Sequence, residues 1–221
     1  MMTTGTGLAT SPAAATTTQG TLGGTGPAPG TIFVADPGVV NSDLGALGPG
    51  SVSLYRPGAS SHARPEVVIT KGLAGPVGIA VDSSGNLWVA NMGGDVVEYS
   101  RAELAKASPA PTVSIAESGD GLAFDASGDL WVSAAYNVFE YGKAQLLESG
   151  LPTPVFTLNE DDCSLSFDAS GDLWEGSMGH FLSEWPKGEL PKVSPPFRTH
   201  SRSSQGEDHL GPPEHAVPAR F

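Results

Sequence analysis

Three aspartates recur at equivalent places in the chain and could be read as a catalytic set. Asp82, Asp125 and Asp168 each open the pattern Asp-x-Ser-Gly-(Asn/Asp)-Leu-Trp, whose successive tryptophans are 43 residues apart. Equivalent positions in consecutive structural repeats stand well apart, so these carboxylates are not expected to share one site. An aspartate that accepts backbone hydrogen bonds across an Asp-x-x-Gly turn explains the spacing. We therefore predict that the three aspartates cap turns. The equivalent tryptophans, Trp88, Trp131 and Trp174, are expected to pack in the core between neighbouring repeats.

A second set of acids precedes the first strand predicted in each later copy. Glu117 and Asp120 lie before the second copy, and Glu160 and Asp161 lie before the third. If these segments meet at the mouth of a central channel, their carboxylate oxygens would suit Ca²⁺ or Mg²⁺. Solvated loop charge is the other interpretation. These four residues are the candidate metal ligands, and the sequence indicates no other cofactor.

Histidine is the residue expected to act as the general base in a proton abstraction near neutral pH. His180 is the only histidine inside a complete copy, and no carboxylate lies at a recognisable spacing from it. The single cysteine, Cys163, excludes an internal disulfide and precedes an apolar strand, where we expect a small core residue. No nucleophile elbow, zinc-ligand cluster or phosphate-binding loop is present. We assign no catalytic residue.

The residues above lie in a repeat whose copies each contain four short apolar runs separated by turn residues. Such runs predict antiparallel strands, and the turn between the first two predicts a tight hairpin. The predicted strands are 78–81, 87–90, 95–100 and 112–115 in the first complete copy, 122–124, 130–133, 138–141 and 154–158 in the second, and 165–167, 173–174, 181–185 and 192–194 in the third. The inner strands are apolar on both faces, as in sheets covered by neighbouring sheets.

An earlier, divergent copy lacks the innermost strand and carries a loop insertion at 37–51. The predicted organisation is a disordered leader or linker at 1–30 and repeats at 31–194, followed by a disordered tail at 195–221 with a possible closing strand near 211–217. The repeat boundaries are 31–71 for the partial copy, then 72–116, 117–159 and 160–194 for the complete ones.

These features predict an all-β fold, a β-propeller of four-stranded antiparallel blades with about four blades, in a closed or an open ring. The pattern Gly-(Ile/Leu)-Ala-(Val/Phe)-Asp-x-Ser-Gly-(Asn/Asp)-Leu-Trp-Val at 78–89 and 121–132 resembles that of NHL-repeat propellers, which are related to gluconolactonase-like and streptogramin-lyase-like six-bladed folds. The third copy departs from it with Ser164, Ser166 and Glu175. The resemblance implies the fold, and it implies a channel-mouth site in those relatives that are lactonases or lyases.

The charge of the chain limits its partners. The formal net charge is −13, and residues 72–185 contain 17 acidic but only three basic side chains. Such a surface repels phosphate backbones, so we expect no nucleic-acid partner. No apolar stretch is long enough to span a bilayer, and the first residues lack the charged start and apolar run of a secretory signal. The compartment is not determined, although an exported or cell-surface context is favoured.

The sequence favours a non-catalytic binding or scaffolding propeller that presents rim loops to a protein or glycan ligand. The candidate ligand-binding residues are Asn91, Met92, Tyr136 and His180. One alternative is a metal-dependent lactonase or lyase that uses the acids at 117–120 and 160–161. Another is a fragment of a larger NHL-repeat protein without independent activity. An open ring would leave apolar faces exposed and favour self-association.

Overall fold

The structure is a computed structural model that describes residues 26–38, 40–41, 46–115, 117–134, 136–158, 162–177, 182–190 and 199–200. These residues form four antiparallel sheets of three or four strands, a separate two-stranded ladder and two short helical turns, α1 (Arg101–Leu104) and η1 (Lys143–Leu147). The prediction of an all-β, propeller-like fold of about four blades is confirmed.

Each complete sheet follows the chain order, so every strand pairs with its neighbour in sequence. The first contains β6 (Pro76–Val81), β7 (Leu87–Asn91), β8 (Val96–Tyr99) and β9 (Val113–Ile115). The second contains β10 (Gly121–Phe124), β11 (Leu130–Ala134), β12 (Asn137–Tyr141) and β13 (Phe156–Leu158). The third contains β14 (Asp162–Phe167), β15 (Leu173–Ser177), β16 (Leu182–Trp185) and β17 (Thr199–His200).

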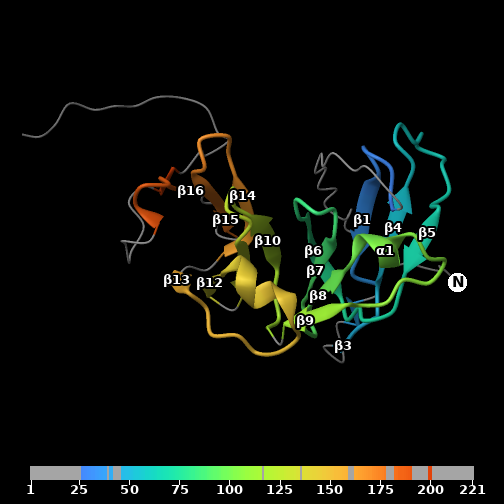
Figure 1. Cartoon of the computed structure of the whole chain (residues 1–221), viewed down its shortest axis with the longest axis horizontal. Helices are drawn as coiled ribbons and strands as arrows, with labels where there is room; N and C mark the ends of the chain where they lie inside the picture. Colours follow the sequence, from blue (N-terminus) through green and yellow to red (C-terminus); the bar gives the residue numbers. More distant parts are fainter. Residues whose placement is uncertain are drawn as a thin grey trace, which may run out of the picture.

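The sheets stand side by side in chain order, from β1–β4–β5 through β6–β9 and β10–β13 to β14–β16 (Figure 1). Among the described residues, the extensive contacts between strands of different sheets all join consecutive sheets, through β1 and β6, β6 and β10, and β10 and β14. The first and last sheets lie at opposite ends of this series (Figure 1). The described part of the chain is therefore an arc of sheets that cover one another's apolar faces.

Two of the three repeat tryptophans fill the spaces between consecutive sheets, as predicted. Trp88 meets Phe124 of the next sheet edge to face, with ring centroids 6.1 Å apart, and Trp131 meets Phe167 in the same way at 5.7 Å. Both tryptophans are buried. Each contact joins an aromatic residue of a second strand to the innermost strand of the following sheet, where the stacking adds to the stability of the interface.

The third repeat tryptophan departs from the prediction. Trp174 is only partly buried, because no described sheet follows β14–β17, and its indole donates to Asp168 Oδ2 at 3.3 Å. The same face of this sheet carries Ser164 and Ser166, where the preceding sheets have glycine and alanine. A more polar outer face is typical of a repeat that caps a stack.

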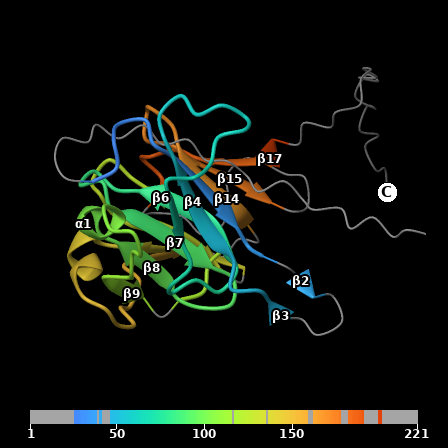
Figure 2. The same ribbon diagram turned by 90° about the vertical axis from the view of Figure 1, so that its right-hand side faces the viewer.

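The partial copy forms the three-stranded sheet of β1 (Ile32–Asp36), β4 (Ser51–Tyr55) and β5 (Val67–Ile69), and no described residue supplies an innermost strand to it. Its insertion contains the ladder of β2 (Val40–Asn41) and β3 (Ala46–Leu47), which stands out from the end of the sheet (Figure 2).

The last complete sheet differs from the prediction at both edges. Its fourth strand is β17, within the segment where we expected a disordered tail, whereas the predicted strand at 192–194 lies outside the described residues. Cys163 is part of β14 and does not precede it. The leader at 1–25 and the closing strand at 211–217 also lie outside the described part of the chain.

Candidate functional site

The repeated aspartates cap their turns in all three copies, as predicted. Asp82 Oδ1 accepts hydrogen bonds from the backbone N–H groups of Ser84 and Asn86, at 2.8 and 2.9 Å. Asp125 and Asp168 accept the two equivalent bonds in their own copies. The glycine of each turn has a positive φ, 84° at Gly85, which an L side chain rarely adopts. These bonds explain why the Asp-x-Ser-Gly spacing recurs.

The residue after each turn glycine has a second structural role. Asn86 Oδ1 accepts from the backbone N–H of Arg101 at 2.9 Å, where α1 begins. Asp129 accepts in the same way from the N–H of Lys143 at 2.7 Å, and Asp172 from that of Lys187 at 2.8 Å. One side chain thus ties the hairpin turn to the start of the segment after the third strand. A carboxylate is not needed here, since Asn86 serves equally well.

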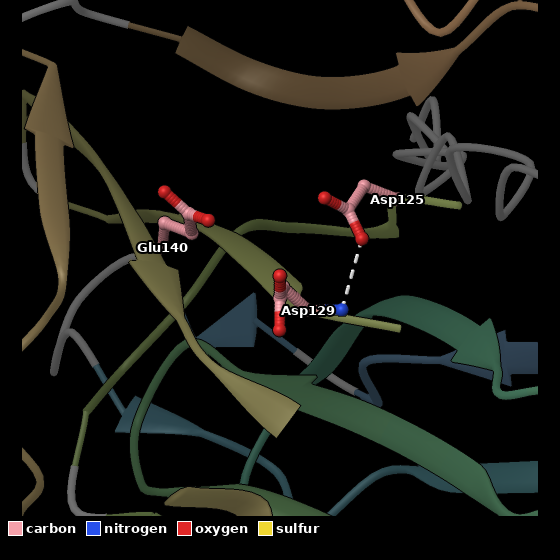
Figure 3. A group of neighbouring side chains, drawn as sticks. All are labelled: Asp125, Asp129 and Glu140. Atoms are coloured by element: carbon pink, nitrogen blue, oxygen red, sulfur yellow. Dashed lines mark hydrogen bonds between the residues drawn. The ribbon is translucent and has the colours of Figure 1, made fainter. Parts of the chain in front are cut away.

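The second complete sheet brings three carboxyl groups together beside this turn (Figure 3). One oxygen from each of Asp125, Asp129 and Glu140 lies within 4.8 Å of the others, and all three residues are partly buried. Burial raises the pKa of the Glu140 carboxyl, and the charges of Asp129 and Asp125 raise it further. We call these residues the acidic triad.

Two residues of the acidic triad border a hollow of about 190 Å³ between the second and third complete sheets. Asp125, Glu140 and Trp131 line one side, whereas Phe167 and Lys187 line the other. The corresponding hollow of about 120 Å³ in the preceding interface is lined by Asp82, Asn86 and Glu98, which are the equivalents of the three triad residues. There the Asn86 amide donates to Asp82 Oδ2 at 2.9 Å, and Glu98 accepts from the hydroxyl of Thr112. In the first interface, Asn86 is therefore hydrogen-bonded to Asp82. In the second, the equivalent residues Asp129 and Asp125 are both carboxylates.

The opposite ends of the sheets form the rim, which we define as residues 91–95, 117–120 and 136. The backbone N–H of Val96 donates to Glu117 O at 2.9 Å, that of Gly119 to Asn91 O at 3.3 Å, and that of Asp120 to Ser133 O at 2.8 Å. The segment 117–120 is thereby fixed between the ends of β7 and β11. The rim and the acidic triad lie at different ends of the same strands.

Two of the predicted ligand-binding residues are exposed on the rim. Met92 is 49% exposed in the turn between β7 and β8, and Tyr136 is 72% exposed between β11 and β12. Tyr136 is the only non-glycine residue of the described chain with a positive φ, 72°. A left-handed conformation costs an L residue roughly 1–2 kcal/mol, and such strain is concentrated at functional positions.

Asn91 has a structural role that conflicts with its prediction as a ligand contact. It is 1% exposed, its Oδ1 accepts from the N–H of Ala74 at 3.0 Å, and its amide donates to Gly72 O and Asp95 O. The sequence could not show that the side chain turns inward to close the loop. His180 lies outside the described residues.

Two of the four candidate metal ligands can be placed, and both are on the rim. Burial raises the pKa of Asp120. Burial also raises the pKa of Glu117, although a hydrogen bond with the Tyr141 hydroxyl lowers it in part. Glu160 and Asp161 lie outside the described residues. Among the described acids, only the acidic triad forms a group of three that could hold a metal.

The structure also shows what sequence reasoning missed. Glu140 was not singled out, although a glutamate precedes the aromatic residue that ends the third strand in every complete copy, at Glu98, Glu140 and Glu184. The register places each one opposite the repeat tryptophan, as Glu140 lies opposite Trp131. This recurrence is a signal that could have located the triad.

A third hollow, of about 200 Å³, separates the innermost strands of the three complete sheets. Its described lining is apolar apart from Ser166, and includes Ile79, Leu122 and Phe167.

Neither helical turn of the described chain is long and apolar enough to cross a membrane. No family model matches the chain, and no curated protein matches it.

Proposed function

We propose that this chain is a non-catalytic binding or scaffolding module that holds a protein or glycan ligand at its rim. The observation that carries the proposal is the exposure of Met92 and Tyr136 at the tips of two neighbouring hairpins. The strands beneath them are rigid, since every residue of β7, β8 and β11 is buried. Variable loops on a rigid scaffold are a common way to present binding residues.

The strained backbone of Tyr136 supports this proposal. Glycine would adopt a φ of 72° without the cost of a side chain, yet a large aromatic residue occupies the position and is mostly exposed. Packing does not account for a side chain that makes so little contact with its own chain. Exposed tyrosines provide large, rigid contact areas in binding surfaces. A role in holding a ligand accounts for both the residue type and its position.

The experiment compares the wild type with Tyr136→Gly and Met92→Ser on a peptide array and a glycan array. The matched control is Leu147→Ser, because Leu147 is 73% exposed on η1, away from the rim. We expect both rim variants to lose binding to the ligands that the wild type retains, while the control keeps it. Equal binding by the wild type and both rim variants would contradict the proposal.

A further inference from the structure

The rim between the first two complete sheets forms one continuous surface. Its three segments are tied together by the backbone bonds of Val96 to Glu117, of Gly119 to Asn91 and of Asp120 to Ser133. Met92 and Tyr136 come from the hairpin tips on either side of the segment 117–120. The exposed apolar side chains and the acidic segment therefore belong to the same face.

The charge of this face is entirely negative. Residues 91–95, 117–120 and 136 include Asp95, Glu117 and Asp120 but no lysine or arginine. Asp95 accepts a hydrogen bond from the Ser114 hydroxyl, whereas Glu117 and Asp120 form no ion pair with any described residue. Partial burial penalises the charged form of both carboxyl groups. A cation placed beside them would offset that penalty.

We infer that the rim binds a cationic segment of another protein, one in which lysine or arginine side chains alternate with apolar ones. Met92 and Tyr136 would contact the apolar side chains, and Glu117 and Asp120 would pair with the basic ones. This inference rests on the proposed function and specifies its ligand. An uncharged glycan would not compensate the carboxylates, and an acidic segment would be repelled by them. Complementary charge of this kind sets the choice of partner and the rate of encounter.

A displayed library of random peptides tests this inference on the full chain. The library is selected against the wild type, and the enriched peptides are then measured against Asp120→Asn and Tyr136→Gly. The controls are Glu148→Gln, which removes one charge from an exposed residue after η1, and Leu147→Ser. Circular dichroism confirms that each variant is folded before its affinity is measured.

We expect enrichment of peptides that combine basic and apolar residues. Each rim variant should weaken their binding by about tenfold, which corresponds to about 1.4 kcal/mol, and each control by less than about twofold. Enrichment of neutral or acidic peptides, or equal weakening by Asp120→Asn and Glu148→Gln, would overturn the inference. So would a library that yields no peptide able to distinguish the wild type from the rim variants.

The glycan array separates this inference from the function on which it rests. If glycans bind the wild type and lose affinity for Tyr136→Gly, the rim remains a binding surface and only the cationic partner is wrong. If neither peptides nor glycans distinguish the rim variants from the controls, both proposals fail.

Discussion

The turn of the second complete sheet predicts that Asp129→Asn stabilises the protein. The substitution keeps the Oδ1 that accepts from the N–H of Lys143, and it supplies an amide to Asp125 Oδ2, as Asn86 does to Asp82 in the preceding sheet. It also removes one charge from the acidic triad, whose oxygens lie within 4.8 Å of one another. The change therefore restores in the second interface the arrangement found in the first.

The expected gain follows from two contributions. Two unit charges about 5 Å apart repel each other by about 1 kcal/mol at the dielectric constant of water, and the partly exposed triad lies close to that limit. The added hydrogen bond contributes about 1 kcal/mol. With allowance for solvent screening, we expect the free energy of unfolding to rise by about 1 kcal/mol and Tm by about 2–4 °C.

Thermal and urea unfolding of three variants measure this effect. Asn86→Asp should lower stability by a similar amount, because it places a like charge beside Asp82. Asp172→Asn should change it less, since Asp168 Oδ2 already accepts from the Trp174 indole. A destabilised Asp129→Asn would refute the reasoning. So would a Ca²⁺-dependent rise in the Tm of the wild type that this variant abolishes, because the triad would then bind a cation.

Four further predictions concern packing and charge. Trp131→Ala should lower the free energy of unfolding by about 3–5 kcal/mol, and Trp174→Ala by much less, because only Trp131 is enclosed between sheets; urea unfolding measures both. The Trp185 indole donates to the fully buried Glu175 at 2.6 Å. Glu175→Ala should therefore lower the free energy of unfolding more than Glu175→Gln in the same assay, because glutamine keeps an acceptor for the indole. Tyr136→Gly should raise Tm by up to about 4 °C, because glycine adopts a positive φ without steric strain. A lower Tm would contradict the interpretation that the backbone at Tyr136 is strained. Burial raises the folded-state pKa of Glu140 above its usual value of 4.5, so the folded protein binds protons more readily than the unfolded chain. Stability should therefore fall as the pH rises from 4.5 through that raised pKa, and Glu140→Gln should reduce the change.

The sequence predicted the features that depend on local chemistry. The Asp-x-Ser-Gly turn follows from side-chain acceptance and a positive φ, and both are properties of a few adjacent residues. The burial of Trp88 and Trp131 followed from the repeat, because each needs only the next copy along the chain. The three described strands of the first sheet were predictable because each corresponds to an apolar run of the partial copy.

The features that sequence reasoning missed depend on what lies across a strand or beyond the last sheet. Asn91 follows an apolar run and could have been exposed or buried, and the acceptors that turn it inward come from residues up to 19 positions away. Glu140 joins the acidic triad only through strand register. Trp174 has the local sequence of its two counterparts, but no described sheet covers it.

Amide hydrogen exchange tests most directly whether rigid, laterally packed sheets support a free rim. We expect slow exchange at β7, β8 and β11, with the amides of β7 and β11 protected in equivalent sets 43 residues apart. We expect fast exchange at Gly94, whose N–H donates only at 3.5 Å, whereas the N–H groups of Met92 and Gly93 donate to Gly75 O and Ala74 O at 3.0 Å. Slow exchange confined to one sheet, or a Gly94 amide as protected as the strands beneath it, would contradict the packing of rigid sheets under an open rim.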